Sequence, residues 1–276
     1  METLEGKTGF IRPTFEEYPN RYLRKNSVDF TPDNRDYAYS ADDLIQYFDD
    51  KNIQNLIVVN PDNPSGNYIP HTDLLKLISW CGNKKIKLVI DESFADFADE
   101  ENNTLIDQQI LSANPHLYVM KSISKSYGVP GLRLGVLASG DTETIALMKK
   151  DVSIWNINSF AEFYMQIEEK YHNDYKNALR EIRKERKRFQ KELSKIDNIR
   201  IIPSQANFFM VELDDKVSVQ QLQTNLLNHH NILIKVLISK TDGRNYLRLA
   251  IRNQRDNDYL STALEQEIKD IKKHAE

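Results

Sequence analysis

The chain lacks the residues and motifs that mark several large classes of protein. Among its 276 residues there is one cysteine, Cys81, which excludes an internal disulfide framework and makes a reducing cytoplasm the expected compartment. Its six histidines show no metal-ligand spacing, so no metal site is predicted. No Gly-x-Ser-x-Gly motif occurs, which argues against a serine hydrolase. No apolar stretch approaches the length of a membrane span, and no apolar segment follows Met1 as in a secretory signal, so no contact with a membrane is expected.

An excess of one charge is also lacking. The 37 Lys and Arg residues are balanced by 41 Asp and Glu, and the resulting net charge of -4 does not favour nucleic acid as a partner. The basic run at 180–188 has Glu181 and Glu185 between its bases and no aromatic residue, which favours a solvated helix face with ion pairs. With 40% apolar residues, the chain is long enough to bury a large core in one or two domains.

The most informative segment that is present is 122–135, with the sequence SISKSYGVPGLRLG. Lys125 lies among small hydroxyl residues just after an apolar run, and Arg133 follows eight positions later. A lysine amine can form a Schiff base with a carbonyl cofactor. Ser122, Ser124 and Arg133 can hold a phosphate, the arginine through two parallel hydrogen bonds. This combination predicts pyridoxal 5′-phosphate (PLP) as the cofactor, and the alternative is a polar turn with a surface lysine.

Two segments upstream support the cofactor interpretation. The apolar run 56–59 leads into a turn that contains Asn63, and the apolar run 86–90 leads directly into Asp91. Polar side chains at the carboxyl ends of parallel strands face the crevice where such sheets bind ligands. An aspartate there can pair with a protonated pyridine nitrogen. Asn63 could instead only shape the turn, and Asp91 could cap a helix, but the joint order with the lysine segment favours a cofactor site.

These segments resemble those of a known family. The resemblance is to the fold type I PLP enzymes, aminotransferase class I/II, and within them to the branch of histidinol-phosphate aminotransferase and threonine-phosphate decarboxylase. The matching segments follow the family's order and span nearly the whole chain. They are Asn60–Gly66, Asp91–Phe94, Ser122–Lys125, Gly131–Gly135 and Tyr246–Leu249.

The resemblance implies a role for each matching residue. Lys125 is implied to form the Schiff base and to carry protons, and Asp91 to partner the pyridine nitrogen. Asn63 is implied to donate to the phenolic oxygen of the ring, and Phe15 to stack on the ring. The implied ligands of the cofactor phosphate are Ser122, Ser124 and Arg133.

The substrate side is implied by the same comparison. Arg248 resembles the arginine that grips the substrate carboxylate. A phosphate on the substrate is plausible for this branch, and Lys235 and Arg252 are the candidates to contact it, unless they are ordinary surface charges. Histidinol phosphate has no carboxylate, so for that substrate Arg248 is expected to meet the phosphate.

The expected fold is α/β, with a mostly parallel sheet sandwiched by helices and a smaller C-terminal α+β domain. We expect a large PLP-binding domain over residues 1–150, connecting helices over 151–195 and a small domain over 196–276. The family has a longer N-terminal part, so the first strand of the large sheet is expected to be missing from this chain. Further strands are expected at 117–120, 132–138 (antiparallel), 207–213, 232–238 and 246–251. Helices are expected at 41–48 (capped by Ser40), 72–80 (ending near Gly82), 160–196 (with a break considered near 172–174), 217–227 and 256–273.

The predicted function is that of a PLP-dependent aminotransferase acting on an amino acid or a phosphorylated amine through Lys125. One alternative is an amino-acid decarboxylase of the threonine-phosphate type, because 155–158 and 249–252, with Asn257 downstream, resemble that branch. Another is a truncated, catalytically silent domain, because the family's phosphate-binding loop is not found. The resemblance also implies a homodimer, since the family's sites lie between subunits.

Overall fold

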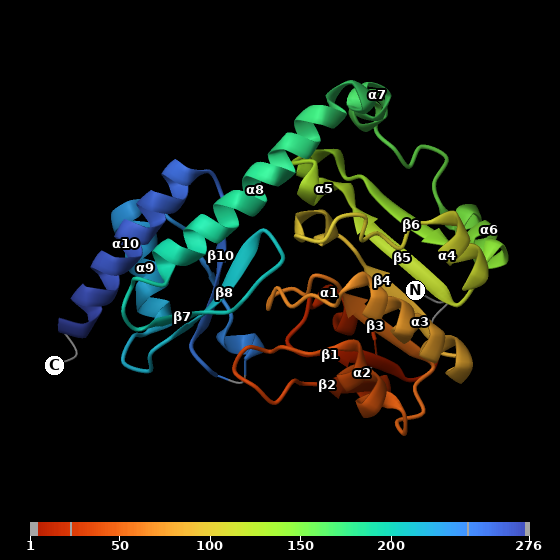
Figure 1. The fold of residues 1–276 in the computed structure, drawn as a ribbon, viewed down its shortest axis with the longest axis horizontal. Coiled ribbons are helices and arrows are strands. Elements are labelled where there is room, and N and C mark those ends of the chain that lie inside the picture. The colour runs from red at the N-terminus through yellow and green to blue at the C-terminus, as the bar shows by residue number, and fades with distance from the viewer. Residues whose placement is uncertain (1–4, 23, 242, 274–276) are drawn as a thin grey trace.

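The computed structural model describes residues 5–22, 24–241 and 243–273. Two sheets lie on either side of the molecule, and the long helix α8 (His172–Leu193) runs diagonally from one to the other (Figure 1). Within the described residues no helix is long and apolar enough to cross a bilayer. Among the same residues, no three His, Cys, Asp or Glu side chains gather as a metal site would require.

The large sheet has six strands in the order β2-β1-β3-β4-β5-β6. All neighbouring strands are parallel except β5 and β6, which are antiparallel as predicted. The segment between β5 and β6 is too short for the crossover helix that a parallel pair needs. The expected α/β class is therefore confirmed. The strands are β1 (Thr8–Ile11), β2 (Ser27–Phe30), β3 (Asn55–Val59), β4 (Lys87–Asp91), β5 (Leu117–Ser122) and β6 (Gly135–Ser139).

Two of these strands, β1 and β2, were not predicted. Both are four residues long. β1 (TGFI) does not alternate between apolar and polar residues, and β2 (SVDF) alternates over its four residues alone. β1 is buried throughout and lies between two other strands, and Gly9 is needed where the chain passes the helix α2 (Ala41–Phe48) and β3. A Cβ at Gly9 would lie 2.8 Å from the Phe48 ring and 3.0 Å from Leu56. β2 and β6 are the two edge strands of this sheet, and β6 leaves Val136 and Leu137 exposed.

Three helices, α2 (Ala41–Phe48), α3 (His71–Lys84) and α4 (Gln108–Ala113), pack on one face of the large sheet and form its main core. The predicted cap of α2 is confirmed, since Ser40 and Asp43 form a reciprocal capping box. α3 ends two residues beyond the predicted end near Gly82, at Lys84, with Lys85 as the left-handed cap residue. Gly82 itself allows close packing, because a Cβ there would lie 2.8 Å from the His116 ring.

After the large sheet the chain is helical, with α6 (Thr142–Asp151) first. The tract predicted at 160–196 is divided into α7 (Ser159–Ile167) and α8 by the 3₁₀ turn η4 (Glu168–Tyr171). Arg188 forms the predicted ion pair with Glu185, at 2.7 Å. However, Arg186 in the same basic run is only 2% exposed, so the predicted solvated face is wrong at this position. Its guanidinium donates to main-chain carbonyls of segments that lie far away in the chain.

The small sheet is antiparallel, in the order β7-β8-β10-β9. Its main core lies between one face of the sheet and the helices α8, α9 and α10. The predicted strand at 232–238 is mostly wrong, because only two of its residues pair and a 3₁₀ turn follows. The predicted domain boundaries stay a prediction. The elements are β7 (Ile199–Ile201), β8 (Phe208–Leu213), α9 (Val219–His230), β9 (Lys235–Val236), η5 (Ile238–Lys240), β10 (Tyr246–Ala250) and α10 (Gln254–Lys273).

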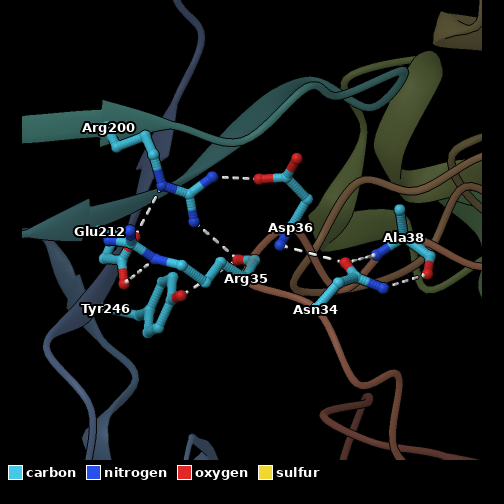
Figure 2. A network of polar contacts seen from close by, with 7 residues as sticks. All are labelled: Asn34, Arg35, Asp36, Ala38, Arg200, Glu212 and Tyr246. Carbon is cyan, nitrogen blue, oxygen red and sulfur yellow. Dashed lines mark hydrogen bonds and ion pairs between the residues drawn. The ribbon is translucent and has the colours of Figure 1, made fainter.

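Charged contacts attach the small sheet to the loop that precedes α2 (Figure 2). Arg35 and Arg200 both bind the carboxylate of Glu212, at 2.8 and 2.7 Å. Arg200 also pairs with Asp36, and the Tyr246 hydroxyl donates to the carbonyl of Arg35 at 3.0 Å. The two sheets are therefore connected by this network as well as by α8.

Candidate active site

The predicted cofactor residues follow the carboxyl ends of three neighbouring strands. In the sheet register Asp91, the last residue of β4, lies between Val59 at the end of β3 and Met120 in β5. Asn63 lies in the turn after β3, and Lys125 lies in the short helix that follows β5. Because these strands are parallel, their ends meet at one edge of the sheet.

The Asp91 carboxylate is buried and held by two side chains. Its Oδ2 accepts a hydrogen bond of 2.6 Å from the Tyr18 hydroxyl of α1 (Glu17–Asn20). Its Oδ1 accepts from the backbone N–H of Ser93 at 2.8 Å and from the Ser93 hydroxyl. Burial, and next the negative charge of Asp91, raise the pKa of Tyr18, so this hydroxyl stays a donor. The Ser93 hydroxyl also accepts from the backbone N–H of Ser122, at 3.0 Å, which connects Asp91 to the end of β5.

Lys125 and Arg248 contact two packed aromatic rings. The Lys125 Nζ lies 5.9 Å from the centre of the Phe94 ring, and Phe94 packs edge-to-face on Phe208 at 5.2 Å. The Arg248 guanidinium lies 4.9 Å from the centre of the Phe208 ring. Its Nη1 donates to the Asn63 Oδ1 at 2.7 Å. The predicted substrate arginine is therefore in direct contact with a predicted cofactor residue, although the two are 185 positions apart in the chain.

Phe15 belongs to the same group of side chains. Its ring packs edge-to-face on Tyr18, with 5.7 Å between the centres, and Tyr18 binds Asp91. Ser124 is buried within the short helix that carries Lys125. We name as the strand-end cluster the residues that the structure brings together in this way. They are Phe15, Tyr18, Asn63, Asp91, Ser93, Phe94, Ser122, Lys125 and Arg248.

The side chains of two further predicted site residues bind groups outside this cluster. Arg133 is exposed, and its Nη1 donates at 3.1 Å to the carbonyl of Pro130, in its own turn η3 (Pro130–Leu132). The main chain beside Arg133 nevertheless adjoins the segment of Ser122 and Ser124, since the Ile123 N–H donates to the Leu134 carbonyl at 3.2 Å, and the three residues stay predicted phosphate ligands. The Arg252 side chain is 69% exposed and pairs with Asp256 at 2.6 Å, at the start of α10.

A cation that the sequence analysis missed lies beside Arg248. Lys240 donates to the carbonyl of Thr14 at 2.7 Å and lies 3.4 Å from the Glu16 carboxylate. Burial lowers the pKa of Lys240, and the charges of Lys235 and Arg248 lower it further against the effect of Glu16. Lys235 and Arg248 are directly opposite each other on β9 and β10, so their side chains share a face of the sheet. No motif marks Lys240, and its 226-residue separation from Thr14 left no local signal.

Next to Asn63, Asp62 is a buried carboxylate that is only partly satisfied. Its Oδ2 accepts from the Ser65 hydroxyl at 2.5 Å, while its Oδ1 has no partner. Burial raises the pKa of Asp62 from 3.8 to about 6, although the hydrogen bonds from Ser65 and the charge of Lys240 act in the opposite direction. Folded Asp62 therefore keeps its proton up to about pH 6, whereas the unfolded chain releases it near pH 4.

This difference predicts a pH effect on stability. Because the folded state binds the extra proton, the free energy of unfolding falls as pH rises from about 4 to 6 and then levels off. Two pKa units correspond to about 3 kcal/mol. We expect Asp62→Asn to remove this contribution, which urea unfolding at pH 4 and pH 7 measures as the difference between the two proteins. Asp33→Asn, at an exposed position, is the control, and equal pH dependence of wild type and Asp62→Asn would contradict the prediction.

Comparison with known proteins decides the family. The sequence profile described as aminotransferase class I and II matches residues 11–264. The chain belongs to the aminotransferase class I and II family. The predicted resemblance is therefore confirmed. So is the predicted cofactor, because this family and its related decarboxylases depend on PLP.

Individual relatives in the aminotransferase class I and II family include both decarboxylases and aminotransferases. The chain is 29% identical over 277 residues to the L-serine phosphate decarboxylase of Sulfurospirillum multivorans, covering 96% of this chain and 69% of the relative. It is 30% identical over 266 residues to the CMP-5'-(3-aminopropyl)phosphonate synthase of Streptomyces rubellomurinus, covering 96% of this chain but 42% of the relative. The crystal structure of the histidinol-phosphate aminotransferase from Clostridium acetobutylicum is similar with a TM-score of 0.85 and 27% identity, covering 96% of this chain and 78% of that one.

The strand-end cluster fits the family's cofactor. It offers a buried carboxylate for a pyridine nitrogen, a lysine amine for an aldehyde and an exposed aromatic ring that can lie against a planar group. For the cofactor phosphate, the described residues offer Ser122 and Ser124 at the start of the short helix, and Arg133 stays a predicted ligand from the adjoining turn. The sequence assigned no role to Tyr18, three residues after Phe15, or to Ser93, within the matching segment Asp91–Phe94. A tyrosine or serine at these positions does not reveal which carboxylate it binds.

Proposed function

We propose that this protein is a PLP-dependent enzyme that decarboxylates an amino acid carrying a phosphate group, with Lys125 as the lysine that holds the cofactor. The observation that supports this substrate is the gathering of Lys235, Lys240 and Arg248 beside Asn63. Glu16 is the carboxylate in contact with Lys240, so the cations outnumber the acids there.

A substrate with two anionic groups suits this arrangement better than one with a single anionic group. Arg248 can bind a carboxylate through two parallel hydrogen bonds, while the two lysines act as point charges on a phosphate. Histidinol phosphate has only the phosphate and would leave part of this positive charge without a partner. A phosphorylated amino acid, such as phosphoserine, has both groups.

Each residue of the strand-end cluster has a task in this proposal. PLP, when bound, supplies an electron sink for a bond at the substrate α-carbon. Lys125 holds the cofactor and carries a proton to or from that carbon. Asp91, fixed by Tyr18 and Ser93, holds the proton of the pyridine nitrogen.

Asn63 and Arg248 position the ring and the substrate. The Asn63 Oδ1 accepts from Arg248, which turns its NH₂ group toward the other side, where it can donate to the phenolic oxygen. Arg248 is held by both Asn63 and Phe208, so it can fix the direction of the substrate carboxylate. Decarboxylation requires the bond to this carboxylate to stand perpendicular to the ring.

The test uses the purified protein, incubated with PLP and then with O-phosphoserine, O-phosphothreonine or serine. We expect carbon dioxide and the phosphorylated amine from a phosphorylated substrate, and little product from serine. A keto acid with pyridoxamine phosphate, and no carbon dioxide, would overturn decarboxylation in favour of transamination. Failure of borohydride to attach PLP to the protein would instead support the catalytically silent domain.

Transamination is the second candidate. It is favoured by the close similarity to the histidinol-phosphate aminotransferase structure, and the same residues can perform it. The two reactions differ in which bond of the α-carbon is aligned with the ring, and a small change in substrate tilt selects between them. The predicted homodimer also stays a proposal, and the exposed apolar residues Ile154, Trp155 and Phe160 offer a surface for it.

Arg248→Met is expected to raise KM for a phosphorylated amino acid by about 10- to 100-fold, because a charged hydrogen bond contributes about 1.5–3 kcal/mol. Steady-state kinetics measures this, and cofactor attachment should persist because Lys125 is unchanged. Arg255→Met, at an exposed position on α10, is the matched control and should leave KM within about twofold. An unchanged KM in Arg248→Met would contradict the assigned contact.

A further inference from the structure

The helix that carries Lys125 is too short to be stable by itself. This helix, α5 (Ile123–Ser126), has four residues, and no side chain caps its N-terminus. Helices of this length are not stable without tertiary contacts. The direction in which Lys125 presents its amine therefore depends on what holds α5 in place.

The carboxylate of Asp96 accepts hydrogen bonds from one residue before Lys125 and one residue after it. Asp96 lies in the 3₁₀ turn η2 (Ala95–Phe97), directly after the loop that contains Ser93 and Phe94. Its Oδ1 accepts from the Lys121 Nζ at 2.5 Å, and its Oδ2 accepts from the Ser126 hydroxyl at 2.6 Å. The Asp96 and Lys121 side chains are only 16% and 14% exposed, so water weakens their attraction little.

Helix α8 contacts Asp96 and so helps to fix its position. Arg183 donates to the Asp96 carbonyl at 2.9 Å. Burial, and next the charge of the nearby Asp96 carboxylate, raise the pKa of Tyr175, so its hydroxyl stays protonated. The Tyr175 ring stacks on Tyr127, with 4.1 Å between the centres and 8° between the planes. Tyr127 directly follows α5, so this stack braces the same short helix.

We infer that Asp96 is a positioning residue, which fixes the orientation of α5 and so the direction of the Lys125 amine. This inference rests on the proposed function, because it concerns how Lys125 reaches the cofactor aldehyde. Asp96 does not contact the reacting atoms in this account. It acts through Lys121 and Ser126, one on each side of Lys125.

The test separates cofactor binding from cofactor attachment. Wild type, Asp96→Ala and Asp96→Asn are compared in two measurements. The first is the rate at which PLP becomes attached to Lys125 in borohydride-trapped samples, read by peptide mass mapping. The second is the affinity for 4′-deoxypyridoxine 5′-phosphate, which has no aldehyde. We expect Asp96→Ala to slow attachment about 10- to 100-fold, because small misplacements of a reacting group cost this much, and to change the affinity less than threefold.

Asp96→Asn should fall between Asp96→Ala and wild type, since its amide can still bind Lys121 and Ser126 but has lost the charge. Amide hydrogen exchange of residues 122–127 in the cofactor-free protein should be faster in Asp96→Ala. Asp99→Ala is the matched control. It removes a contact between the same loop and α8, at Arg186, without touching α5, and it should leave the attachment rate and this exchange unchanged.

The outcomes distinguish the two proposals. Equal attachment rates in wild type and Asp96→Ala would overturn this inference alone. An equal slowing in Asp99→Ala would overturn it too, because general loosening of the loop would then explain the effect. If wild type itself never attaches PLP, the proposed function fails, and the role of Asp96 toward Lys125 fails with it.

Discussion

Lys125→Ala is expected to abolish covalent uptake of PLP and to lower turnover by at least about 10⁴-fold. The lysine amine is proposed both to hold the cofactor and to move a proton, and proton transfer alone contributes about 10²–10⁴-fold. The loss of covalent uptake is measured by the absorbance of the attached cofactor and by borohydride trapping. The loss of turnover is measured by product formation. Because the Lys125 Nζ lies above the Phe94 ring and forms no ion pair among the residues that the structure describes, the variant should fold normally.

The control for this prediction is Lys149→Ala, which removes an exposed amine from α6. It should take up PLP and turn over substrate as wild type does. Trapped cofactor on another lysine of Lys125→Ala, together with retained turnover, would show that the amine has been assigned to the wrong residue.

Arg186→Met is expected to lower the free energy of unfolding by about 3–5 kcal/mol, the usual cost of removing one partner from a buried charged contact. The guanidinium is 2% exposed and donates to the carbonyls of Phe97 (2.6 Å) and Gln205 (2.9 Å) and to the Asp99 carboxylate (2.9 Å). Methionine fills similar space but offers no donor, so the carbonyls of Phe97 and Gln205 would lose this donor, whereas the partly exposed Asp99 carboxylate keeps its contact with Lys187. The midpoint of urea unfolding measures the effect.

Lys184→Met, an exposed change on the same helix, is the matched control and should shift stability by no more than about 0.5 kcal/mol. Arg186→Lys tests whether charge alone is sufficient. A single ammonium cannot reach both carbonyls and Asp99 in the same geometry, so we expect most of the loss to remain. A loss below about 1 kcal/mol in Arg186→Met would mean that the buried guanidinium contributes little to the packing of α8.

Much of the strand-end cluster could be predicted from local patterns. An apolar run followed by a polar residue predicts the end of a buried parallel strand, and the ends of neighbouring parallel strands meet at one edge. This reasoning was sufficient to group Asn63, Asp91 and Lys125. The antiparallel β6 could also be predicted, because the length of the connection leaves no room for a crossover helix. By contrast, β1 was missed because a strand buried on both sides has no alternating pattern.

Other parts depend on pairs that are far apart in the chain. The contact of Arg248 with Asn63 spans 185 residues, and that of Lys240 with Thr14 spans 226. The contact of the Arg133 guanidinium with the carbonyl of Pro130 in its own turn was likewise not predicted.

The amino-acid sequence was enough to predict the family and its cofactor, because the residues proposed to bind PLP follow strands that form from local apolar patterns. The sequence alone could not show which basic side chains are buried, which cations lie close to one another, or which contacts hold α5 in place. Arg186, Lys240 and Asp96 acquire their roles from neighbours supplied by distant segments, and burial and electrostatic contacts exist only once those segments have packed together.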